Sequence, residues 1–210
     1  MLRSRGFLMN QRIFALSASV VLLSAAAFAQ NPITADSPFQ VRYAANLNIG
    51  DSVVDITNTG ATGNSICVNV YTFAPDEQEI SCCTCKVTPD GLASLSVKNS
   101  LINNTLTGVV PPAVVVKLLA TTSGSCNAAA PGSPAIGMAA WGTTIHALPV
   151  TPGSPATTYG VTETAFTPST LSPAEFIRAT ALCGFIQTDG SGFGICGGCA
   201  TGGLGAATAQ

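Results

Sequence analysis

The chain has 210 residues, of which 47% are hydrophobic and only 9% are charged. Charged residues make up about a quarter of an ordinary soluble domain, so this surface must consist largely of Thr, Ser, Asn, Gly and Ala. Eight basic residues against ten acidic ones give no basic patch, which disfavours binding to nucleic acid or to anionic lipid.

The N-terminus has the features of an export signal. Three arginines accompany an apolar stretch at 13–23, and the small residues of "AAAFAQ" offer a cleavage site before Gln30. Translation from Met9 would leave a shorter signal of the same kind. We therefore interpret residues 1–29 as a signal peptide, with an uncleaved anchor as the alternative, and expect no transmembrane span after cleavage.

Cleavage would leave a single-domain chain with five basic and ten acidic residues. We expect residues 30–38 to be a flexible segment, 39–199 to be one β-rich domain, and 200–210 to be a flexible Gly/Ala tail. Export through the general pathway would place this domain outside the cell or at its surface, with the periplasm as the alternative.

Apolar and polar residues alternate through most of the chain, beginning at Phe39, with the period of half-buried strands. Gly, Pro, Asn or Asp separate most of these segments, as in a sandwich or barrel. The pattern predicts a mainly β fold, an antiparallel β-sandwich with Greek-key-like connections. The candidate strands are 39–50, 52–60, 65–75, 79–89, 92–99, 112–122, 138–148 and 157–166.

One short C-terminal helix is predicted within "LSPAEFIRATALCG". Ser172 is a favourable N-cap, a proline follows it, and Glu175 completes a capping box. Gly184 is a natural stop at the other end. We expect the chain beyond it to form a small hairpin that turns at Gly190.

Eight cysteines follow the predicted signal peptide. An even number of cysteines in an oxidising compartment predicts four structural disulfides. The cysteines are Cys67, Cys82, Cys83, Cys85, Cys126, Cys183, Cys196 and Cys199.

Two pairings follow from the expected hairpins. A hairpin that turns at Asp76 would place Cys67 opposite Cys85, and the hairpin at Gly190 would bring Cys196 close to Cys183. The other four cysteines would pair among themselves. Cys82 and Cys83 are adjacent on a strand and point to opposite faces, so we expect them to take different partners.

Metal and redox sites are the alternatives to structural disulfides. The motifs "CCTC" and "CGGC" resemble halves of a zinc site, but neither has a histidine nearby. A redox C-x-x-C usually begins a helix, whereas "CGGC" lies in a glycine-rich segment. The acidic cluster at Asp76–Glu79 is interpreted as a solvated hairpin tip, with calcium binding as the alternative. We expect no metal and no cofactor.

The segment Gly50-Asp51-Ser52-Val53 resembles the GDS block of GDSL-type esterases, in which the serine is the nucleophile. That resemblance implies a base histidine within a D-x-x-H motif. The one histidine, His146, has Thr143 in the place of that aspartate, and the other blocks of the family are missing. We therefore interpret Gly-Asp as a turn, and keep a secreted hydrolase only as an alternative.

The remaining class is a non-enzymatic structural, surface or adhesive protein that associates edge to edge with itself, as a homo-oligomer or an extracellular fibre, or with other surface proteins. Natural sheets often protect their edges with lysine, and this chain has three lysines in total. The main alternative is a glycan-binding module, which would expose aromatic side chains on one face. The candidate binding residues are Trp141, Tyr71 and Tyr159, with Tyr43 in addition.

Overall fold

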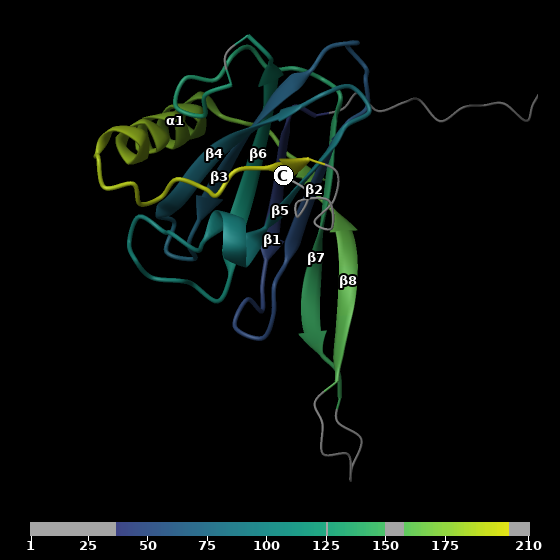
Figure 1. The fold of residues 1–210 in the computed structure, drawn as a ribbon, viewed down its shortest axis with the longest axis vertical. Helices are drawn as coiled ribbons and strands as arrows, with labels where there is room; N and C mark the ends of the chain where they lie inside the picture. Colours follow the sequence, from purple (N-terminus) through teal and green to yellow (C-terminus); the bar gives the residue numbers. More distant parts are fainter. Residues whose placement is uncertain (1–36, 125, 150–157, 202–210) are drawn as a thin grey trace, which may run out of the picture. The chain divides into compact units, whose positions relative to one another are not determined.

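The computed structural model describes residues 37–124, 126–149 and 158–201. The predicted signal peptide, residues 30–36 of the predicted flexible segment and residues 202–210 of the predicted tail lie outside this part. The described chain forms two antiparallel sheets of five strands each, which confirms the predicted mainly β sandwich (Figure 1). Sheet A has the order β4 (Glu79–Val87), β3 (Ile66–Phe73), β6 (Val114–Thr122), β1 (Phe39–Ala44), β9 (Thr167–Pro168). Sheet B has the order β10 (Ala200–Thr201), β5 (Leu92–Ser96), β2 (Val53–Asn58), β7 (Met138–Ala147), β8 (Tyr159–Ala165).

The main hydrophobic core lies between the two sheets. Alternate residues of each strand enter it, as a strand's period of two requires. Val68 and Val70 of β3, for example, are fully buried and meet Val54 and Ile56 of β2 within one apolar cluster. A π-helical turn, η1 (Val97–Leu101), continues β5 and adds further apolar side chains to this cluster.

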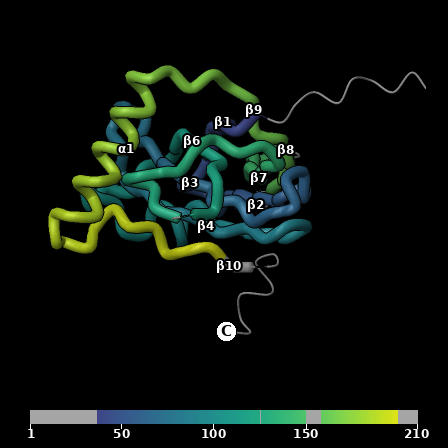
Figure 2. Tube along the Cα trace, turned by 90° about the horizontal axis from the view of Figure 1, so that it is seen from above, coloured from purple at the N-terminus to yellow at the C-terminus, as the bar shows by residue number. Residues whose placement is uncertain are grey.

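The predicted helix, α1 (Pro173–Thr188), covers the outer face of sheet A and makes a third layer (Figure 2). Ser172 caps it as expected, because its hydroxyl accepts a hydrogen bond from the Glu175 N–H at 3.1 Å. A second apolar cluster fills the space beneath the helix and contains Tyr71 and Cys183. Both faces of β3 are therefore covered, which explains why all eight of its residues are buried.

Two predicted boundaries are wrong. The first strand ends at Ala44 rather than at residue 50, since Asn46 adopts a left-handed conformation (φ 63°) that begins a turn. The helix passes Gly184 and continues to Thr188, because that glycine lies in a helical turn with room around it. Neither helix in the described part of the chain is long and apolar enough to cross a membrane.

Candidate functional site

All eight cysteines form disulfides, as the sequence predicted. Their Cα–Cα distances lie between 5.3 and 5.7 Å, within the range that a disulfide requires. In this state, "CCTC" and "CGGC" offer no free thiolate to a zinc ion or a redox partner. The bridges are Cys67–Cys126, Cys82–Cys183, Cys83–Cys196 and Cys85–Cys199.

The predicted Cys67–Cys85 bridge is wrong because of a β-bulge. The hairpin of β3 and β4 turns where expected, but the bulge inserts one extra residue, Ile80, into β4. Lys86 rather than Cys85 then lies opposite Cys67. Cys85 consequently faces the core between the sheets, while Cys67 faces outward and bonds to Cys126.

The predicted Cys183–Cys196 bridge is also wrong. Because the helix continues past Gly184, Cys183 points toward sheet A and bonds to Cys82. The chain beyond the helix then returns alongside β4, where Cys196 reaches Cys83. The expectation that the adjacent Cys82 and Cys83 take different partners on opposite faces is confirmed.

The C-terminal segment closes one side of the sandwich. The Cys82 N–H donates a hydrogen bond to the Gly194 carbonyl at 2.9 Å, and the Cys196 N–H donates one to the Cys82 carbonyl at 3.2 Å. The segment then crosses to sheet B, where β10 pairs with β5 (Figure 2). Two disulfides hold it along the way, so the β4 edge of sheet A is partly covered.

The esterase-like segment has a structural role in this fold. Ser52 is buried, and its hydroxyl donates to the Thr143 carbonyl. Asp51 accepts hydrogen bonds from Ser96 and from a backbone N–H of η1. His146 contacts the Thr162 hydroxyl at 2.7 Å rather than Ser52. The described residues therefore assemble no serine–histidine pair at this segment.

The candidate binding aromatics do not share a surface. Tyr71 is buried beneath α1, where its hydroxyl donates to the Ala128 carbonyl at 2.7 Å, so its assignment as a binding residue is wrong. Trp141 is half-buried and Tyr159 is exposed, both on the outer face of sheet B. They lie at opposite ends of the paired β7 and β8, about 20 Å apart at ~3.4 Å per residue. Tyr43 lies on the other sheet. These positions form no continuous aromatic platform.

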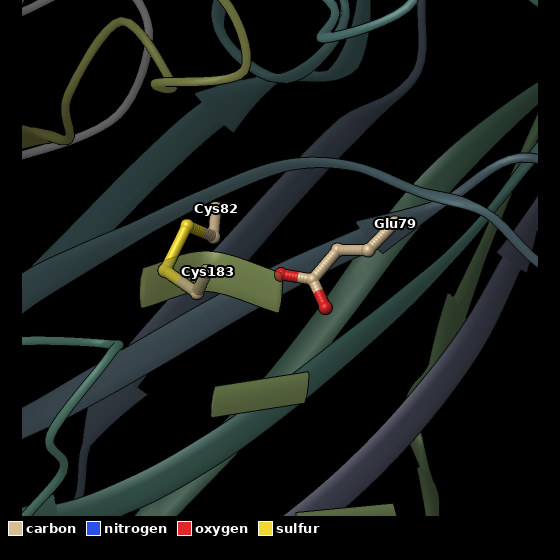
Figure 3. A group of neighbouring side chains, drawn as sticks. All are labelled: Glu79, Cys82 and Cys183. Atoms are coloured by element: carbon tan, nitrogen blue, oxygen red, sulfur yellow. A yellow bond between two sulfur atoms is a disulfide. The ribbon is translucent and has the colours of Figure 1, made fainter. Parts of the chain in front are cut away.

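Glu79 is a buried acid that the sequence pattern placed wrongly on the solvated hairpin tip. It belongs to β4, is only 3% exposed, and neither of its carboxyl oxygens has a hydrogen-bond partner in the described chain. One of these oxygens and the sulfur atoms of Cys82 and Cys183 lie within 4.8 Å of one another (Figure 3). Because the two sulfur atoms are joined in a disulfide, they supply no thiolate and the three groups form no metal site in the oxidised protein.

Burial raises the pKa of the Glu79 carboxyl to about 8. Lys117 and Arg178 oppose this shift in pKa, and Glu175 reinforces it. Lys117 is itself engaged elsewhere, since its ammonium group forms an ion pair with Glu175 and lies 3.9 Å from the centre of the Phe73 ring. At neutral pH the raised pKa therefore favours the protonated, neutral form of this carboxyl.

The free edge of β8 is the most distinctive surface of the described chain. All but one of its residues are exposed, and in the described part of the molecule it pairs with β7 alone. Tyr159 and Val161 are 52% and 63% exposed. Glu163 is the one charged residue of the strand, so neither lysine nor arginine protects this edge.

The other three sheet edges have fewer backbone groups free to pair with another strand. At the opposite edge of sheet B, β10 has two residues, and in sheet A β9 also has two and ends in a proline. The β4 edge receives hydrogen bonds from the C-terminal segment and from the Leu106 N–H. The sequence predicted β8 as a strand but not as an edge. One sequence feature could have identified the edge, namely that this strand has polar residues on both faces. Thr162 and Thr164 lie on one face, and Glu163 lies on the other.

The chain matches no protein-family model, no curated protein and no solved structure.

Proposed function

We propose that this protein is an exported, non-enzymatic structural domain that associates through the free edge of β8. Its partners would be further copies of itself or other proteins of the cell surface or extracellular space. Four disulfides indicate an oxidising extracellular or periplasmic environment. The basic and apolar N-terminal segment supports delivery there by the general export pathway.

The observation that carries this proposal is the unprotected edge itself. An exposed strand presents a row of N–H and C=O groups that can pair with another chain. Natural sheets usually discourage such pairing with lysine, proline or a covering segment, and β8 has none of these in the described chain. The same sandwich covers its β4 edge with a segment held by two disulfides. The contrast between the two edges favours association as the role of β8.

Sedimentation velocity over a concentration series tests the proposal directly. The full-length gene should be expressed with export, so that the host processes the chain and forms its disulfides. We expect the average mass to rise with concentration, and Val161→Glu to weaken association at least tenfold by adding a negative charge to an edge that already carries Glu163. Val109→Glu is the matched control, because Val109 is an equally exposed valine (64%) in a loop between η1 and β6.

A wild-type protein that remains monomeric up to about 1 mM would contradict self-association, since that concentration detects even a free energy of binding near −4 kcal/mol. Equal weakening by both glutamate variants would instead show that general charge, rather than the β8 edge, controls association.

A further inference from the structure

We infer that the partner of β8 is β8 of a second copy, paired antiparallel about a two-fold axis at Thr162, in a closed dimer. This inference rests on the proposed self-association, and adds to it the partner, the register and the stoichiometry.

The first step is to establish which backbone groups of β8 point away from β7. The Leu148 N–H donates to the Thr158 carbonyl at 2.9 Å, and the Phe166 N–H donates to the Ala140 carbonyl at 2.8 Å. These two bonds lie at the two ends of the same ladder and fix its phase, because hydrogen-bonded and non-hydrogen-bonded pairs alternate in antiparallel strands. The residues with N–H and C=O groups directed to the free side are therefore Tyr159, Val161, Glu163 and Ala165.

The second step is the choice of register. An axis at Thr162 pairs Val161 with Glu163 of the second copy and Tyr159 with Ala165 of the second copy. All four outward-facing residues then find partners, the large tyrosine lies beside the small alanine, and each carboxylate lies opposite a valine. Cross-strand neighbours of this kind lie about 5 Å apart and interact directly.

The neighbouring registers are worse for identifiable reasons. An axis at Glu163 would place two carboxylates directly opposite each other, which is destabilising. An axis at Val161 would leave Ala165 without a partner among the residues of β8, so the ladder within the described strand would be shorter. Of these three registers, the one with the axis at Thr162 is therefore the one that pairs all four outward-facing residues and keeps the two carboxylates apart.

The third step concerns closure. Pairing of β8 with itself is isologous and uses the same surface on both copies, so it ends at two. Growth into a filament would need a second long free edge. In the described chain the β9 and β10 edges are two residues long, and the β4 edge is partly covered by the C-terminal segment. The hairpin of β7 and β8 also extends past the ends of the neighbouring strands (Figure 1).

A cysteine scan of the edge tests the register. Thr162→Cys would place the new thiol opposite its own copy in a non-hydrogen-bonded pair, where Cα atoms are about 4.5 Å apart and a disulfide can form. Thr164→Cys is the control, since residue 164 would lie opposite Gly160 of the second copy. We expect a covalent dimer from Thr162→Cys on non-reducing electrophoresis, at least tenfold more abundant than from Thr164→Cys.

A second variant tests the same β8 pairing without an introduced cysteine. Val161→Pro removes an N–H that points to the free side, so it leaves the ladder with β7 intact while removing a donor from the dimer. We expect this variant to dissociate at least tenfold more readily than the wild type, with an unchanged circular dichroism spectrum.

The outcomes separate this inference from the proposed function. Association that grows beyond two copies, that cross-links equally at both positions, or that survives Val161→Pro would overturn the β8 dimer and leave self-association standing. A wild-type protein that sediments as a monomer at every concentration would overturn both.

Discussion

The buried carboxyl of Glu79 predicts an unusual dependence of stability on pH. In the unfolded chain this carboxyl has its ordinary pKa of 4.5, whereas burial raises the pKa to about 8 in the folded chain. Between these values the folded protein keeps a proton that the unfolded protein releases. The free energy of unfolding therefore falls as the pH rises, by about 1.4 kcal/mol per pH unit from this group.

The substitution Glu79→Gln isolates this effect, because glutamine has nearly the same shape and stays neutral in both states. The interval from pH 4.5 to 7 corresponds to a loss of about 3 kcal/mol in the wild type that the variant does not share. We expect Glu79→Gln to be more stable than the wild type by up to about 3 kcal/mol at pH 7. The two proteins should be alike at pH 4, where both side chains are neutral.

Urea unfolding at pH 4, 5.5, 7 and 8, with the disulfides intact, measures the difference. Glu77→Gln is the matched control, because it makes the same substitution at an exposed position at the tip of the same hairpin. Parallel profiles for Glu79→Gln and the wild type would refute the reasoning. A less stable variant at pH 7 would show that the carboxyl is ionised and stabilises a nearby cation such as Lys117.

Two further predictions concern the C-terminal segment. Gly194→Ala should destabilise the fold by about 2 kcal/mol in urea unfolding, since φ is +79° and a Cβ would lie 2.9 Å from the Ile186 side chain. Gly192→Ala, with φ of +75° and open space around it, should lose only about 1 kcal/mol, and equal losses would exclude a contribution from the close contact. Replacing both Cys85 and Cys199 with alanine should lower the free energy of unfolding by about 2 kcal/mol. An isolated bridge across 114 residues would contribute ~5 kcal/mol, but Cys83–Cys196 still closes nearly the same loop in this variant. A loss near 5 kcal/mol in thermal or urea unfolding would show that the two bridges act independently.

Local patterns in the sequence predicted the strands and the helix start well, because alternation and capping depend on neighbouring residues. Ser172 caps α1 as expected, and the predicted strands correspond to observed ones. The disulfide partners depended on register, and one extra residue at Ile80 was enough to turn Cys85 away from Cys67. A bulge of this kind has no strong local signature.

The burial of Glu79 could not be read from its neighbours either. It follows Asp76 and Glu77 in an acidic run that is typical of a solvated turn. What buries it is α1, which lies about a hundred residues later in the chain and is bonded to β4 through Cys82–Cys183. Side chains whose surroundings come from distant segments are the ones that sequence periodicity assigns wrongly.

The placement of the disulfides bears on the proposed role of β8. Three of the four bridges start from β4, and they attach α1 and the C-terminal segment to that side of the sandwich. In the described chain no disulfide reaches β7 or β8, where the long edge is held by its ladder to one neighbour. If crosslinking served stability alone, this weakly attached hairpin would be the place that gained most from a bridge. A bridge of the kind that attaches the C-terminal segment to β4 would, however, require a covering segment on the free side of β8. Among the described residues no segment covers the free side of β8, as a surface that pairs with a second chain requires.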